Sequence, residues 1–236
     1  MQGLIVAAGQ GSRLRAIAPC KPLAKVGGTP LIQSVIVAAR AAGVDEFVVV
    51  TGYQAPLVEA FLSRLAALLS LRIETVFNPG WEGGNGLSVA AAGPVLAERF
   101  LLMMSDHLFE PGLPAALLAD GGTPDGVTLA VDRRLDNPLV DLADVTRAQT
   151  SPDGRILRLG KLIEPFDAFD TGVFLASHAL IDAIEETHAA GGSGSITDGM
   201  NRLAERGLAR AFDIGERFWF DIDDPVAHAQ AERMSA

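Results

Sequence analysis

Apolar, β-branched runs alternate along the first half of the chain with stretches whose apolar residues recur at helical spacing. This alternation predicts strands joined by crossover helices, and therefore a mostly parallel sheet. The expected strands are Gly3–Ala8, Glu46–Thr51, Arg72–Phe77 and Phe100–Met104. The expected helices between them are Pro30–Ala42, Ala55–Leu69 and Leu87–Leu96. The pattern is typical of an α/β protein.

Beyond Pro111 the order of strands and helices becomes less regular. The expected strands there are Gly126–Val131, Asp144–Gln149, Ile156–Leu159, Asp170–Ala176 and Arg217–Phe220. The expected helices are His178–His188, Ile196–Glu205 and Pro225–Arg233. With 236 residues, of which 49% are hydrophobic, the chain can bury the core of one α/β domain. We expect residues 1–236 to form a single domain whose mixed, mostly parallel sheet is flanked by helices.

Composition restricts the compartment and the partners. A lone cysteine, Cys20, excludes an internal disulfide framework and suits a reducing compartment. No apolar run approaches the roughly 20 residues of a membrane helix, so we expect a cytoplasmic protein without membrane insertion. The net charge of −10 would repel a long phosphate polymer, so we expect no nucleic-acid partner. A homodimer stays open.

Charge is strongly segregated along the chain. Residues 1–44 hold five of the 19 basic residues and no acidic one, and the first acidic residue is Asp45. The remaining residues hold 14 basic and 29 acidic side chains, a net charge of −15. The amino-terminal segment can therefore meet a phosphate group locally, although the whole protein is acidic.

A glycine-rich turn follows the first strand within this basic segment. Gly9 and Gly11 allow a close approach of backbone N–H groups to a ligand, and nearby cations supply the counter-charge of a polyphosphate. A dinucleotide fingerprint would need a further glycine where Leu14 stands. A P-loop would need Ser or Thr after the lysine, but Lys21 precedes a proline. A solvated surface turn is the alternative interpretation.

Three segments here resemble the opening of the nucleoside-triphosphate transferases that activate phosphorylated sugars and alcohols: AAGQGSRL (7–14), CKPL (20–23) and VGGTPLI (26–32). The family pattern is AAGxGTRL, PKxL and GxPLI, and it implies a Rossmann-like nucleotidyltransferase fold. Ser12 replaces the usual threonine, and Cys20 adds one residue before Lys21. By this resemblance Lys21 lies over the reacting phosphate. The other implied nucleotide-binding residues are Ala7, Ala8 and Gly9 for base and ribose, and Gly11, Ser12 and Arg13 for the β- and γ-phosphates.

A second glycine-rich run, GGNGLS at 83–88, comes just before a predicted helix. Taken alone, Asn85 or Ser88 is a helix N-cap. The run also resembles the GNGYSL segment of cytidylyltransferases, in which this loop closes on the pyrimidine and its ribose. The resemblance therefore implies that Asn85, Gly86 and Ser88 bind the nucleotide, with Leu87 in place of the tyrosine.

Acidic residues at two distant points predict a magnesium site. Asp106 follows a hydrophobic run at the carboxyl end of a central strand, where open α/β sheets place their ligands. Magnesium prefers one or two carboxylates with phosphate oxygens, and Asp221 and Asp223 point the same way on a period-two strand. The family resemblance favours Asp221, with Asp223 as the alternative. Taken alone, Asp224 is a helix N-cap. His107 should face away from Asp106 and support the site from outside.

Lys161 and the acids after it belong to the predicted acceptor side. Taken alone, Lys161 is a solvated strand end. However, LGK (159–161) and DTGVF (170–174) resemble segments of the inositol-1-phosphate cytidylyltransferases. The resemblance implies that Lys161 grips the acceptor phosphate, that Asp170 accepts a hydrogen bond from a hydroxyl, and that Asp198 faces the substrate.

The implied reaction transfers CMP from CTP to a phosphorylated alcohol, inositol 1-phosphate above all, and releases CDP-inositol and pyrophosphate. A phosphomonoester is already mostly a dianion near pH 7, so no general base is needed. Catalysis then requires alignment and positive charge, for which Arg13, Lys21, Lys161 and Mg²⁺ are the predicted catalytic groups.

Several alternatives stay open. The acceptor alternatives are phosphocholine, aminoethylphosphonate and hexose 1-phosphates. The alternatives from other classes are a glycosyltransferase of related fold and a non-catalytic nucleotide-binding module. Because we find no membrane segment in this sequence, any later transferase that uses the product is expected to be a separate chain.

Overall fold

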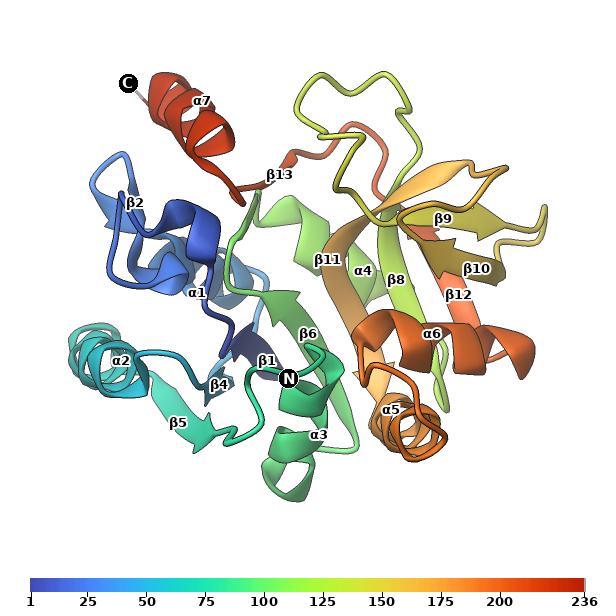
Figure 1. Ribbon diagram of the computed structural model, residues 1–236, viewed down its shortest axis with the longest axis horizontal. Helices are drawn as coiled ribbons and strands as arrows, with labels where there is room; N and C mark the ends of the chain where they lie inside the picture. The colour runs from blue at the N-terminus through green and yellow to red at the C-terminus, as the bar shows by residue number, and fades with distance from the viewer. Residues whose placement is uncertain (236) are drawn as a thin grey trace.

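A central mixed β-sheet carries the fold, and helices cover both of its faces (Figure 1). The computed structural model describes residues 1–235. Within them the sheet has nine strands, of which seven follow the order β10-β9-β11-β6-β1-β4-β5, while β8 pairs with β11 and β12 pairs with β8. The predicted α/β class with a sheet flanked by helices is confirmed.

The amino-terminal half of the sheet is parallel, as the sequence predicts. Its strands are β1 (Gln2–Ala7), β4 (Glu46–Thr51), β5 (Arg72–Phe77) and β6 (Arg99–Met104). Its helices are α1 (Leu31–Ala41), α2 (Ala55–Leu69) and α3 (Gly86–Ala92). Helix α3 ends four residues before the predicted boundary, because Gly93 and Pro94 begin a short 3₁₀ turn that ends at Val95.

The second half adds antiparallel pairing. The long strand β11 (Ala168–Ser177) runs antiparallel to β6, β8 and β9, while β12 runs parallel to β8. The strands around it are β8 (Val127–Asp132), β9 (Arg147–Thr150), β10 (Ile156–Gly160) and β12 (Ala209–Asp213). Its helices are α5 (His178–Ala189) and α6 (Ile196–Glu205). Strand β9 begins three residues later than predicted, which leaves Asp144 in the loop before it.

Some short elements lie outside the sequence prediction. They are β2 (Lys25–Val26), β3 (Thr29–Pro30), β7 (His107–Phe109), α4 (Gly112–Asp120) and β12, together with 3₁₀ turns at Ser12–Leu14 and Lys21–Leu23. Strand β7 pairs with β13 (Trp219–Asp221), and this small ribbon joins the middle of the chain to its carboxyl-terminal part. Helix α7 (Pro225–Ser235) follows and packs beside β2 (Figure 1).

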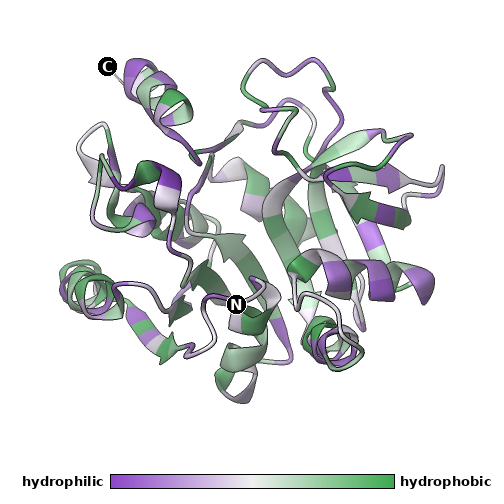
Figure 2. Cartoon of the chain, in the orientation of Figure 1, coloured by the Kyte–Doolittle hydropathy of each residue, from purple (hydrophilic) through white to green (hydrophobic). Residues whose placement is uncertain are grey.

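Two apolar layers hold the helices against the sheet. Along β1, Leu4 and Val6 pack toward α3, α5 and α6, while Ile5 and Ala7 pack toward α1, α2 and α4. Figure 2 accordingly shows the central strands in hydrophobic colours and much of α6 in hydrophilic ones. A third cluster joins Leu14 and Ala24 of the amino-terminal segment to Phe220 and Ile222. This cluster fixes the glycine-rich turn beside the carboxyl-terminal acids.

Between residues 1 and 235, none of the helices combines the length and the apolar character that are needed to cross a bilayer. The cytoplasmic location and the homodimer stay predictions.

Candidate active site

A cleft opens at the carboxyl ends of the parallel strands, where the sequence places its candidate residues. It consists of two adjoining hollows of about 270 Å³ and 370 Å³. The larger hollow faces the glycine-rich turn, and the smaller faces Lys161 and Asp170. The hollows share Arg13, Asn85, Met104, Asp106 and Asp223. The predicted nucleotide and acceptor sides therefore meet in one place.

The glycine-rich turn lines the larger hollow with Gly9, Gly11, Ser12 and Arg13. Gly11 has φ +55°, and a Cβ there would overlap the Cβ of Lys21, so this position requires glycine. A Cβ on Gly9 would meet no atom within 4 Å, which leaves open space beside that backbone. The turn thus presents backbone and cation to the hollow, as a phosphate cradle needs.

Ala7 and Ala8 lie at the end of β1 and are buried. Ala7 pairs with Thr51, and the Ala8 carbonyl accepts a hydrogen bond of 2.9 Å from the N–H of Tyr53. Val6 and Gly9, on either side of the two alanines, line the larger hollow. Ala7 and Ala8 are not among the described residues that line it. Their predicted contacts with base and ribose stay a prediction.

Lys21 lies almost fully buried at the centre of the cleft, with 9% of its surface exposed. Its ammonium group forms ion pairs with Asp106 and Asp223. Burial alone would lower the pKa of Lys21, but the surrounding carboxylates, Asp106 above all, raise it above its ordinary value. Lys21 is therefore a fixed positive charge that does not lose its proton at neutral pH.

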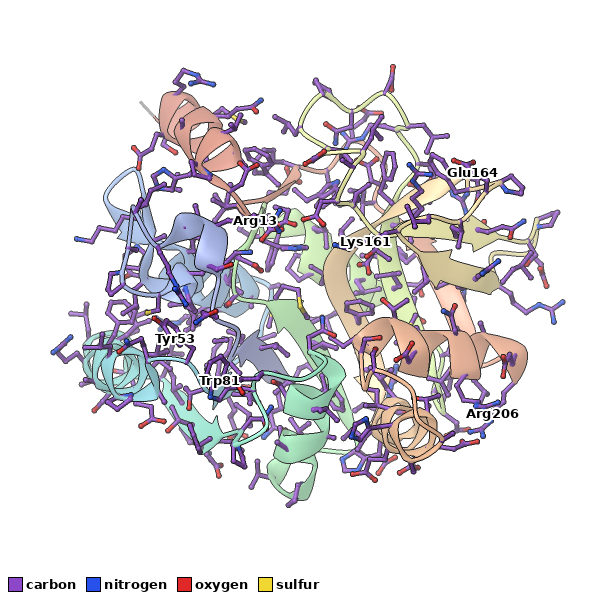
Figure 3. All side chains as sticks on the ribbon, viewed as in Figure 1. Arg13, Tyr53, Trp81, Lys161, Glu164 and Arg206 are labelled. Carbon is purple, nitrogen blue, oxygen red and sulfur yellow. The ribbon has the colours of Figure 1, made fainter. Side chains whose placement is uncertain are left out.

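Arg13 and Lys161 reach the centre of the cleft from elements far apart in the chain (Figure 3). One Arg13 nitrogen lies 2.7 Å from Asp144 and also pairs with Asp223. Lys161 pairs with the other oxygen of Asp144. The three predicted catalytic cations therefore gather in one cleft, and each of them already contacts a carboxylate.

Asp106 and Asp221 come together through the pairing of β7 with β13, which places Asp221 opposite His107. Burial would raise the pKa of Asp106, but the charges of Lys21 and His107 hold it below its ordinary value. The buried Oδ1 of Asp221 accepts no hydrogen bond among residues 1–235, and its charged neighbour is the His107 ring, 3.4 Å away. A carboxylate oxygen that accepts no hydrogen bond keeps lone pairs available to a cation.

The expectation that His107 faces away from Asp106 was wrong. The His107 Nε2 atom lies 3.9 Å from Asp106 and 3.4 Å from Asp221. Alternation of side chains fails here because β6 ends at Met104 and the chain turns before β7 begins. The other ring nitrogen lies 2.8 Å from the Thr171 carbonyl. Burial would lower the pKa of His107, but the carboxylate of Asp221 raises it to about 10.

Asp221 and Asp223 both line the cleft, but so does Asp224, because β13 ends at Asp221 and strand alternation does not extend to the residues after it. Asp223 contacts Arg13 and Lys21, whereas Asp221 contacts His107. Burial raises the pKa of Asp223 to about 6, against the opposing charge of Lys21. Asp224 accepts hydrogen bonds of 2.8 Å from Val226 N–H and Ala227 N–H and so caps α7. The same short segment therefore serves both the cleft and a helix start.

The donor set fits a divalent cation. Asp106 and Asp221 offer carboxylate oxygens that lie, together with the His107 ring nitrogen, within 4.8 Å of one another. Among the carboxylates of the cleft, Asp106, Asp144 and Asp223 pair with the cations Arg13, Lys21 and Lys161, and Asp221 pairs with His107. Because the cations are already paired, these carboxylates oppose the entry of a polyphosphate, and a divalent cation would offset their charge. Hard oxygen donors of this kind suit Mg²⁺.

Asn85 joins two helices at the edge of the cleft. It occupies the N-cap position of α3, but its side chain makes no capping bond there and instead accepts a 2.9 Å hydrogen bond from Ile196 N–H. A Cβ on Gly86 would lie 2.7 Å from the Gly194 carbonyl oxygen, so this glycine allows the loop to pack closely. Ser88 accepts a 3.0 Å hydrogen bond from Asn78. Asn85 and Ser88 both line the larger hollow.

On the acceptor side, the structure brings Asp170 to the cleft but not Asp198. Asp170 lines the smaller hollow and accepts a 2.8 Å hydrogen bond from Gly172 N–H. Burial raises the pKa of Asp170 to about 6. Asp198 instead accepts bonds from Ser193 and Ser195 in the capping box of α6. The geometry gives no support to the substrate contact predicted for Asp198.

Among the residues that line the cleft, Asp144 and Trp81 are two that the sequence did not predict. Asp144 was expected within a strand, and no motif marks it as a partner of Arg13 and Lys161. Trp81 lines the larger hollow, and its ring centre lies 5.5 Å from that of Tyr53. Its position two residues before the glycine-rich GGNG run was the available signal.

Comparison with known families decides between the classes left open above. The model of the MobA-like NTP transferase domain matches residues 3–205. The chain belongs to this family. The nucleotidyltransferase family predicted from the amino-terminal motifs is therefore confirmed.

This MobA-like NTP transferase has relatives of about twice its length. It is 34% identical over 234 residues to the "Bifunctional IPC transferase and DIPP synthase" of Rubrobacter xylanophilus, covering 98% of this chain and 51% of the relative. It is 29% identical over 236 residues to the protein of the same name from Aquifex aeolicus, covering 98% of this chain and 50% of the relative. The chain thus spans about half the length of these relatives.

The fold of the MobA-like NTP transferase is similar to that of a solved structure, the inositol-1-phosphate CTP transferase from T. maritima. The TM-score is 0.84 at 24% sequence identity, and the match covers 99% of this chain and 94% of the other. This similarity confirms the predicted nucleotidyltransferase fold.

Proposed function

We propose that the protein is a CTP:inositol-1-phosphate cytidylyltransferase, which transfers CMP from CTP to inositol 1-phosphate and releases pyrophosphate. One observation carries the proposal: 98% of the chain matches a relative whose name includes IPC transferase, at 34% identity. The cleft supports it, because a nucleotide cradle and an acceptor-side lysine meet around one group of carboxylates. The proposal concerns the nucleotidyl transfer alone.

The chain's own residues divide the task between nucleotide and acceptor. The turn from Gly9 to Arg13 binds the triphosphate of CTP through backbone N–H groups and one guanidinium group. Lys161 binds the phosphate of the acceptor and brings it close to the α-phosphorus. Lys21 stabilises the charge that develops on the transferred phosphoryl group. The acceptor oxygen then attacks the α-phosphorus, the bond to the β-phosphate breaks, and pyrophosphate leaves.

A general base is not part of this mechanism, because a phosphomonoester is already largely a dianion near pH 7. Asp106 and Asp221 would hold Mg²⁺, with Asp223 as the alternative ligand, and the bound ion would neutralise phosphate charge and polarise a phosphoryl oxygen. Asp106 additionally keeps Lys21 charged and in place. Loss of this one carboxylate should therefore affect two contributions to catalysis.

The lining of the smaller hollow supports a hydroxyl-rich acceptor. Asp170, Thr146 and Thr197 line it and offer oxygen atoms to hydroxyl groups. A quaternary ammonium such as choline would instead need exposed aromatic faces. Phe174 and Trp219 expose no more than 3% of their surface, so they offer little ring area to such a cation. A polyol phosphate fits this lining better than phosphocholine does.

We also propose that the nucleotidyltransferase unit is one domain. Strand β6 pairs with β1, which precedes the nucleotide turn, and with β11, which carries Asp170. One continuous sheet therefore supports both sides of the cleft.

The test is a pyrophosphate-release assay with the purified protein and Mg²⁺. Each of the four nucleoside triphosphates is combined with inositol 1-phosphate, phosphocholine, 2-aminoethylphosphonate or glucose 1-phosphate, and the products are identified by mass spectrometry. We expect rapid release with CTP and inositol 1-phosphate, together with CDP-inositol. Faster release with another pair would assign another substrate. Binding of CTP without any release would instead indicate a nucleotide-binding module.

A further inference from the structure

Asp144 bridges the two sides of the cleft. Its Oδ2 atom lies 2.7 Å from an Arg13 guanidinium nitrogen, and its Oδ1 atom pairs with the Lys161 ammonium group. Arg13 comes from the turn after β1, and Lys161 comes from the end of β10. The carboxylate is 26% exposed, so water and solutes reach this bridge. Neither the motifs nor the family resemblance assigns Asp144 a role.

The loop between β8 and β9, residues 133–146, holds Asp144 in this position. The N–H of Asp144 donates a 3.1 Å hydrogen bond to the carbonyl of Asp141. Arg147 donates a 3.3 Å hydrogen bond to the carbonyl of Leu142, and this bond anchors the middle of the loop to β9. The loop therefore presents the Asp144 carboxylate in a defined direction, at a high effective concentration beside its two cations.

Arg13 and Lys161 are the cations to which the proposed function assigns phosphate groups. A divalent cation can offset the carboxylates of Asp106 and Asp221, because those residues offer neighbouring ligand atoms. Asp144 lies outside that ligand group and pairs with Arg13 and Lys161. A phosphate group that binds these cations must therefore replace the Asp144 carboxylate or share them with it.

We propose that Asp144 is an internal competitor for substrate and product phosphate. In the free protein its carboxylate contacts Lys161 and also Arg13, which Asp223 contacts as well, and it withdraws from both cations when a phosphate group enters. The incoming phosphate prevails because it brings more negative charge and more acceptor oxygens than one carboxylate. The competition lowers the affinity for phosphate-bearing ligands and so speeds their release. The identity of the natural ligand rests on the proposed function, but the competition applies to any phosphate group that reaches these two cations.

The test measures binding of inorganic pyrophosphate by titration calorimetry, without divalent cations so that no metal contributes. The Asp144→Asn substitution removes the charge and keeps the size of the side chain. We expect pyrophosphate to bind about threefold to tenfold more tightly, as loss of two partly exposed ion pairs would allow. Unchanged or weaker binding would overturn the proposal. If the Asn variant does not fold, Asp144→Ser replaces it.

Asp141→Asn is the matched control, because it removes the same charge from the same loop. Asp141 also lines the cleft, but its carboxylate accepts a 2.9 Å hydrogen bond from Ala143 N–H and pairs with no cation among residues 1–235. We expect less than a twofold change in pyrophosphate affinity. An equal gain in both variants would mean that long-range charge is the cause, and this would overturn a competition by contact.

A double substitution tests whether Asp144 competes through its contact with Lys161. In a Lys161→Gln protein, one of the two cations contested by Asp144 is missing. Adding Asp144→Asn should then increase pyrophosphate affinity by a clearly smaller factor than in the unmodified protein. An undiminished gain would overturn the competition for Lys161.

The binding experiment separates this inference from the proposed function. If Asp144→Asn tightens pyrophosphate binding but no CDP-inositol is formed, the proposed function alone fails. If CDP-inositol is formed and pyrophosphate affinity does not respond to Asp144→Asn, the competition alone fails.

Discussion

Asp106 has two neighbours within the cleft, because it lies beside Asp221 and also forms an ion pair with Lys21. The Asp106→Asn variant keeps the shape of the side chain and removes its charge. We expect kcat for pyrophosphate release to fall by about 100-fold or more in Mg²⁺, as for loss of one strong electrostatic contribution. Asp45→Asn, at a side chain that is 78% exposed, is the control and should keep full activity. A folded Asp106→Asn protein with near-normal turnover would contradict the metal assignment.

Lys161 lines the smaller hollow with Asp170 and lies outside the glycine-rich turn. For Lys161→Gln we expect the KM for the acceptor to rise by about tenfold, because a charge-assisted bond to its phosphate is lost. The KM for CTP should change less than twofold. Lys25→Gln, at an exposed lysine, is the control and should leave both constants unchanged. A rise confined to the KM for CTP would place Lys161 on the nucleotide side.

At the scale of elements, the fully buried Asp132 connects strand β8 to β13 and to the start of the 133–146 loop. It accepts hydrogen bonds of 2.8 Å from the Trp219 indole and from Asn137, and one of 2.9 Å from the Arg134 side chain. Burial would raise the pKa of Asp132, but the bonds from Arg134 and Trp219 hold it below its ordinary value.

Because its pKa is lower in the folded protein, Asp132 stabilises the fold at pH values above its pKa in the unfolded chain, which is about 4. This stabilisation is lost as the pH falls through the lower pKa that Asp132 has in the folded protein. We expect Asp132→Asn to reduce the free energy of unfolding by about 2–4 kcal/mol at pH 7, since it leaves Arg134 without its buried partner. Urea unfolding at pH 7 and below pH 4 measures the free energy of unfolding of the unmodified protein and of Asp132→Asn. The difference between these two free energies should be smaller at the lower pH. Equal stability at pH 7 would show that Asp132 contributes nothing.

The long periodic elements could be predicted from the sequence, and the short elements around the cleft could not. Strands β1 and β4 to β6 are strongly apolar or periodic, so each of their boundaries lies within one residue of the predicted one. Strand β7 has three residues and exists through its pairing with β13, more than 100 residues away. Local pattern carries no information about such a pairing. The orientation of His107 was missed for the same reason.

At the scale of the whole molecule, the segregated charges of the sequence meet again in the cleft. Arg13 pairs with Asp144 and Asp223, which are 131 and 210 residues away along the chain. The sequence indicated that basic residues of the segment 1–44 would meet phosphate, and the fold places two of them, Arg13 and Lys21, in the cleft. It could not indicate that acids from the other end would already neutralise them, because that depends on how β13 and the 133–146 loop approach the turn.

This neutralisation predicts how the protein responds to removal of divalent cations. A triphosphate carries several negative charges, and the cleft offers Arg13, Lys21 and Lys161 already paired with carboxylates. In EDTA we therefore expect CTP to bind at least about tenfold more weakly than in excess Mg²⁺, measured by titration calorimetry. Cytidine is the matched ligand control: it lacks phosphate, so its affinity should not depend on the metal. Equal CTP affinity in both conditions would mean that the paired cations release their carboxylates without help, and that the charge balance of the cleft does not govern nucleotide binding.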